Sequence, residues 1–120
     1  MAKNFKDLIV WQKAFSLSIN VYKTTKTFPN SELYGLSQQI RRSSISIPSN
    51  IAEGFNRYHN KEYKQFLYIA LGSCAELETQ IRIANKLGYI EDERSAEILI
   101  IISYISRMLS NLIKKLWTRY

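Results

Sequence analysis

The chain has 120 residues, of which 46% are hydrophobic and 22% are charged, with only 4 Gly and 2 Pro. This length fits a single domain over residues 1–120, and the composition excludes disordered, collagen-like and glycine-rich linker proteins. The 17 Lys and Arg exceed the 10 Asp and Glu by seven, and this positive charge favours an acidic partner.

Apolar spacing predicts a first helix over Asp7–Phe28 and a second helix over Glu32–Arg57. The first stripe is Val10, Ala14, Leu17, Val21 and Phe28, and a second set, Leu8, Trp11, Phe15, Ile19 and Tyr22, widens it. The stripe of the second helix is Leu33, Leu36, Ile40, Ile47 and Ile51. Pro48 lies inside this second segment, where it lacks a backbone donor and crowds the preceding turn, so we expect a kinked helix. Two shorter helices are the alternative.

The third and fourth helices are predicted over Lys61–Leu87 and Glu93–Trp117, and Gly88 is the expected stop signal between them. Both carry an apolar repeat in which steps of four and three residues alternate. Its members are Tyr63, Leu67, Ala70, Cys74, Leu77, Ile81 and Ala84, then Ile98, Ile102, Ile105, Leu109, Leu112 and Leu116. Four long helices joined by short turns predict an all-α, up-down-up-down antiparallel four-helix bundle.

The apolar run Ile98–Ile102 covers every direction around the fourth helix, whereas a surface helix of a bundle needs only one apolar stripe. One interpretation is a thick core with scattered exposed apolar residues. We prefer a second buried face, formed between copies of the chain. The expected state is therefore a homo-oligomer.

Five motifs are spread along nearly the whole chain: VWQKA at 10–14, FP at 28–29, QIRR at 39–42, SIPSNIAEG at 46–54 and LGYI at 87–90. These motifs resemble a bacterial family of four-helix-bundle proteins. The family is also called the ribosomal-RNA intervening-sequence protein family, because some members are encoded inside insertions in 23S rRNA genes.

The resemblance implies a four-helix subunit assembled as a homopentameric ring. It also implies kinship with accessory proteins of diversity-generating retroelements, which bind nucleic acid and a reverse transcriptase. Ser43 and Ser44 depart from the alanines that the resemblance leads us to expect, and they make the face around Arg42 more polar.

Polar residues form a stripe on the second helix and repeat on the third: Gln39, Arg42, Ser46, Ser49 and Glu53, then Ser73, Glu76 and Gln80. One interpretation is an active site built on Arg42, Glu53 and Glu76. We favour a structural polar network that fixes helix register or a subunit contact, because no nucleophile–base pair or Glu-x-x-His motif accompanies these residues. The expected network is Gln39, Arg42, Asn50, Glu53 and Glu76.

In an up-down bundle, the starts of the first and third helices meet the ends of the second and fourth. The candidate nucleic-acid-binding residues at this end are Lys3, Lys6, Arg57, Lys61, Lys64, Lys114, Lys115 and Arg119. Helix dipoles disfavour lysines at helix starts, so the four at positions 3, 6, 61 and 64 point to an anionic ligand. Tyr58, Trp117 and Tyr120 are candidates to stack on bases or to pack at the rim.

Little in the chain points to catalysis. Cys74, the single cysteine, occupies a core position, and His59, the single histidine, lies in a predicted loop. We therefore expect no enzyme, no metal and no cofactor. The lone thiol favours a reducing compartment, and charges within the N-terminal segment argue against a signal peptide, so we expect a cytoplasmic protein. The longest uncharged run is about eleven residues, which is too short for a membrane span.

These patterns together predict a non-enzymatic, homo-oligomeric bundle that binds nucleic acid, with structured RNA as the favoured ligand, through one basic end and with little sequence preference. The alternative is a protein–protein adaptor whose basic end binds an acidic protein surface.

Overall fold

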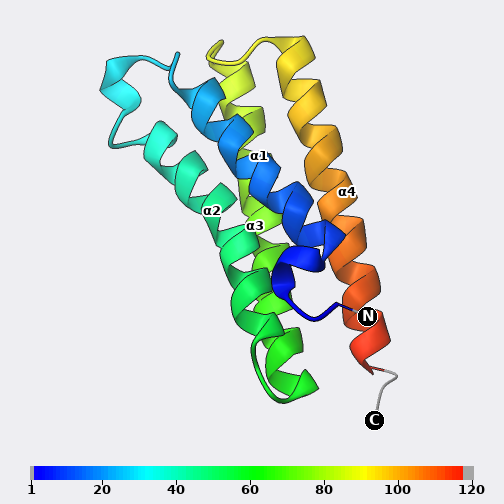
Figure 1. Ribbon diagram of the computed structural model, residues 1–120. Coiled ribbons are helices and arrows are strands. Elements are labelled where there is room, and N and C mark those ends of the chain that lie inside the picture. The colour runs from blue at the N-terminus through cyan, green and yellow to red at the C-terminus, as the bar shows by residue number, and fades with distance from the viewer. Residues whose placement is uncertain (1, 118–120) are drawn as a thin grey trace.

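The computed structural model describes residues 2–117, which form four long α-helices running alternately up and down, side by side (Figure 1). They are α1 (Ile9–Thr25), α2 (Leu36–Phe55), α3 (Asn60–Lys86) and α4 (Asp92–Trp117), with two short 3-10 helices, η1 (Phe5–Asp7) and η2 (Asn30–Glu32). No strand occurs among the described residues. The predicted all-α chain of four helices is confirmed.

Helices α1 and α2 are shorter than predicted, because hydrogen bonds in the turns before them fix the residue at which each helix begins. The side chain of Asn4 accepts a hydrogen bond from the backbone N–H of Lys6 at 2.9 Å and caps η1. Pro29 then precedes η2, and a Glu32 carboxylate oxygen accepts the backbone N–H of Leu36 at 3.2 Å, where α2 begins. As predicted, Gly88 follows the end of α3, with a positive φ of 81° that favours glycine.

Helix α2 continues through Pro48 without interruption, so the alternative of two shorter helices is wrong. Proline has no N–H to give to the carbonyl one turn earlier, which belongs to Ser44. The Ser18 hydroxyl of α1 donates to that carbonyl at 2.9 Å and takes the place of the missing donor. The kink at Pro48 stays a prediction.

The predicted core positions of α3 and α4 are buried with two exceptions, Tyr63 and Leu112, which are half-buried. Near the end of α4 the buried position moves from Leu112 to Ile113, because a 3.6-residue turn drifts relative to a seven-residue repeat. Cys74 lies in this core, and burial raises the pKa of its thiol to about 11, so the thiol stays protonated at neutral pH.

By length and hydropathy alone, α4 could cross a membrane, a property that it shares with core helices of bundles. One side of α4 faces the core through Ile98, Ile102, Ile105 and Leu109. Leu99, Ile101, Met108 and Leu112 are half-buried and pack against this core. The large apolar residues of α4 that are exposed are Ile100, Tyr104 and Trp117, so only part of the run at 98–102 lies outside the core.

Helix α2 approaches α3 closely at Gly54, where a side chain would not fit. A Cβ atom there would lie 2.8 Å from the Cβ atom of Phe66 and 3.2 Å from the backbone oxygen of Tyr63. We expect Gly54→Ala to lower the free energy of unfolding by about 1 to 2 kcal/mol, because overpacking outweighs the better helix propensity of alanine.

The matched control is Gly72→Ala, at an exposed position in α3 where an added Cβ would meet no atom within 4 Å. That change should raise the free energy of unfolding by about 0.5 to 1 kcal/mol. Urea unfolding of both variants at one subunit concentration checks the opposite signs, and a stabilised Gly54→Ala variant would contradict the close approach.

Candidate nucleic-acid interface

The N-terminal segment, the last turn of α2, the α2–α3 connection, the first two turns of α3 and the last turn of α4 lie toward the same end of the bundle (Figure 1). Seven of the eight predicted nucleic-acid-binding residues belong to these segments, and Arg119 lies outside the described residues. Six of the seven are exposed, and we call these six the basic end: Lys3, Lys6, Arg57, Lys61, Lys114 and Lys115.

Few carboxylates oppose these cations. Asp7, Glu53 and Glu62 are the acidic residues in the same segments, so seven bases including Lys64 leave a net charge of +4 within the described residues. Glu53 forms an exposed ion pair with Arg57 at 3.2 Å, a type of pair that contributes little stability. The lysines at this end therefore generate a positive field that a polyanion would neutralise.

The helix dipole explains only part of this arrangement. Lys114 and Lys115 lie in the last turn of α4, where a cation is favourable. Lys61 lies in the first turn of α3, where the dipole repels a cation. Helix stability therefore gives no reason for a lysine at this position.

Lys64 is a candidate nucleic-acid-binding residue by sequence, but the structure buries it, with only 4% of the residue exposed. The last turn of α4 covers it: the Lys64 Nζ atom lies 3.2 Å from the centre of the Trp117 ring, in a cation–π contact. The Trp117 indole N–H in turn donates to the Tyr68 hydroxyl at 3.3 Å. Lys64 thus joins α3 to α4 and presents no ammonium group to a ligand.

Tyr58 is the most open of the candidate stacking residues, with 92% of its surface exposed at the tip of the α2–α3 connection. Its ring meets the exposed His59 ring edge-on, with 4.8 Å between the centroids. Trp117 is half-exposed, but Lys64 covers one face of its ring. Tyr120 lies outside the described residues.

The two polar stripes face each other between α2 and α3. The Ser46 and Ser73 hydroxyls are 2.7 Å apart, and the Ser43 hydroxyl donates to Glu76 at 3.0 Å. The Asn50 amide donates to the Ser46 carbonyl at 2.7 Å. These contacts border a polar groove of about 400 Å³, lined by Gln39, Arg42, Ser43, Ser46, Glu76 and Gln80.

The hydrogen-bonded contacts between the stripes differ from the predicted network in three members. Gln39 and Arg42 line the groove but are exposed, and their side chains make no hydrogen bond or ion pair with a described residue. Glu53 pairs instead with Arg57 near the end of α2. The polar stripe of α2 turns outward at Arg42, so the Glu76 carboxylate does not compensate a buried arginine charge.

Sequence reasoning missed Ser43 as a member of the groove. Its buried hydroxyl bonds to Glu76, although the sequence marks it only as a polar departure from a family pattern. The available signal was its spacing, since Ser43 lies four residues after Gln39 and three before Ser46, on one side of a helix.

Comparison with known proteins supports the family assigned from the motifs. Residues 6–111 match the family model described as 23S rRNA-intervening sequence protein. A crystal structure of a protein of unknown function, from the S23 ribosomal protein family of Bacteroides thetaiotaomicron, is 26% identical and superposes with a TM-score of 0.80, covering 88% of this chain and 99% of that chain. A search of the curated proteins finds no match. Because the family match extends from η1 into the second half of α4, the chain belongs to the family of 23S rRNA-intervening sequence proteins.

Proposed function

We propose that this protein is a homo-oligomeric, non-enzymatic bundle that binds structured RNA in the cytoplasm through its basic end. The observation that carries the proposal is the exposure of Lys61, Lys114 and Lys115 together at one end of the bundle, with few carboxylates beside them. Phosphate groups bound there would release their condensed counterions, which favours binding at low salt.

Lysine-dominated contacts discriminate little between sequences. A lysine ammonium group acts as a point charge, whereas arginine makes the two-pronged contacts that read guanine. Phosphate contacts fix the position of the nucleic acid without reading its bases. Tyr58 adds an exposed ring on which an unpaired base of any kind could stack.

An apolar groove between α1 and α2 supports oligomerisation. It has a volume of about 500 Å³, and its apolar lining is Phe5, Trp11, Phe15, Ile19, Tyr22, Ile45, Pro48 and Ala52. Phe15, Ile19, Tyr22 and Ile45 are exposed in the single subunit. Exposed apolar side chains gathered on one surface are typical of a protein–protein contact.

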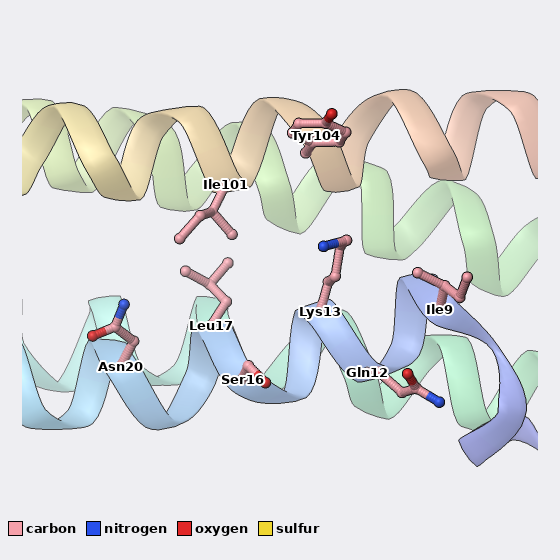
Figure 2. Close-up of a pocket in the computed structure, with 8 residues that line it drawn as sticks. All are labelled: Ile9, Gln12, Lys13, Ser16, Leu17, Asn20, Ile101 and Tyr104. Atoms are coloured by element: carbon pink, nitrogen blue, oxygen red, sulfur yellow. The ribbon is translucent and has the colours of Figure 1, made fainter.

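A second apolar surface lies on α4, away from this groove. Ile100 and Tyr104 are both more than half exposed. Figure 2 shows Tyr104 beside a pocket of about 330 Å³ between α1 and α4, where Ile101 and Leu17 point toward each other. If the α1–α2 groove of one copy contacts the α4 surface of the next, each copy repeats the same head-to-tail contact. Such contacts close into a ring when the rotation between neighbouring copies divides a full turn evenly. The family resemblance implies five subunits for that ring.

The first test is the salt dependence of RNA binding. We expect a structured RNA to bind at about 50 mM salt and to lose most of its affinity by about 200 mM, because several lysine–phosphate contacts release counterions together. Fluorescence anisotropy across a salt series measures the slope, and nuclease-treated protein excludes RNA carried through purification. Failure to bind any RNA at low salt would refute the proposal and favour the adaptor.

A further inference from the structure

Two half-exposed aromatic rings lie together near the basic end, where the last turn of α4 contacts α3. Trp117 on α4 is 53% exposed, and Tyr68 on α3 is 49% exposed. The Trp117 indole N–H donates to the Tyr68 hydroxyl at 3.3 Å, so the two side chains form one cluster. Tryptophan and tyrosine are enriched at binding surfaces, where an apolar ring and a polar group act together. This exposed pair is therefore a candidate site.

Two contacts hold the Trp117 ring in place and leave one of its faces open. The Lys64 Nζ atom lies 3.2 Å from the ring centre and covers one face. The edge that carries the N–H is occupied by Tyr68. The exposed surface of Trp117 therefore belongs mainly to the opposite face and the outer edge of the ring. A ring that is already fixed loses little conformational freedom when a second flat ring stacks on it.

Exposed lysines flank this ring on both helices. Lys114 lies three residues before Trp117, one turn earlier on the same side of α4. Lys61 has the same relation on α3 to Lys64, the residue that covers the ring. A ligand that suits both the ring and the lysines has a flat apolar part with negative charges on either side. A nucleotide within an RNA strand has this chemistry, because its base lies between two phosphates.

We infer that the open face of Trp117 is a stacking platform for an unpaired RNA base, which deepens the proposed function and rests on it for the RNA. A paired base is already stacked on its neighbours, so the base must come from a loop, a bulge or a single-stranded end. Stacking uses the face that every base has, so the platform accepts all four bases. The favoured RNA thus combines a paired region with unpaired nucleotides beside it.

The test compares two labelled RNA duplexes that differ only in a single-stranded overhang of about six nucleotides. One overhang carries adenines, and the other is abasic, so both RNAs have the same number of phosphates. We expect the adenines to tighten binding to the full-length protein about tenfold, within the range of a base–aromatic stack. The salt dependence should be the same for both RNAs, because it reports phosphate contacts.

Substitutions of Trp117 locate the stacked base. Trp117→Leu should remove the gain from the adenines and leave binding of the abasic RNA unchanged, because leucine has no flat ring. Trp117→Phe should keep more than half of the gain. Both variants lose the bond to Tyr68, so that loss cannot explain a difference between them. The matched control is Tyr34→Leu, which removes a ring that is 86% exposed just before α2, at the opposite end of the bundle, and should keep the full gain.

The outcomes separate this inference from the proposed function. Equal affinity of the wild-type protein for both RNAs overturns the platform and leaves RNA binding by the basic end intact. A gain that survives Trp117→Leu places the base on another ring and overturns the platform as well. Equal loss in Trp117→Leu and Trp117→Phe would assign Trp117 a structural role only. If neither RNA binds at low salt, the proposed function fails and the platform fails with it.

Discussion

Reversing three charges at the basic end is expected to abolish RNA binding. The triple variant Lys61→Glu, Lys114→Glu and Lys115→Glu changes exposed residues only, so the fold and the assembly should persist. Each change removes one phosphate contact and adds a repulsive carboxylate, so we expect affinity to fall at least about a hundredfold and the salt slope to fall by about three. Gel-shift titration at low salt measures the loss. Lys64 is left unchanged because it is buried against Trp117.

The opposite end of the bundle supplies a control of equal charge. Lys23, Lys26 and Lys86 are also exposed, and they lie at the C-terminal ends of α1 and α3. Changing these three residues to Glu lowers the net charge by the same amount, so any general effect of charge would appear equally in both variants. Similar losses from the two sets would rule out a polarised RNA surface.

A single charge in the α1–α2 groove is expected to break the oligomer. Ile19 lines this groove with 47% of its surface exposed, so the subunit should tolerate glutamate there. Burying that unpaired carboxylate between two subunits would be strongly unfavourable. Light scattering coupled to size exclusion should show the wild-type chain at about five times the subunit mass. The Ile19→Glu variant should elute as the 14.1 kDa subunit.

Ile83→Glu is the matched control, because Ile83 lies on α3, outside the α1–α2 groove, and is 46% exposed. The same substitution at the same exposure should leave the assembly intact. A wild-type chain that already runs as a monomer at micromolar concentration would refute the second-face argument. An Ile19→Glu variant of full oligomer mass would place the contact on another surface.

The sequence alone determined the number of helices, their approximate limits and most of the core. These properties are local: an apolar residue every three or four positions defines one face of a helix, and Gly88 supplies the left-handed turn that ends α3. The position of Cys74 in the core repeat was predictable for the same reason. The motifs likewise indicated the family.

Only the tertiary structure decided which polar residues meet, because that depends on how one helix is rotated and shifted against the next. It placed Trp117 over Lys64 and so buried a lysine that helix position alone leaves exposed. It brought the Ser18 hydroxyl to the carbonyl that Pro48 leaves without a donor. It also turned Arg42 of α2 outward while enclosing Gln80 of α3, because the residues of the two polar stripes differ in burial according to how each faces the neighbouring helix.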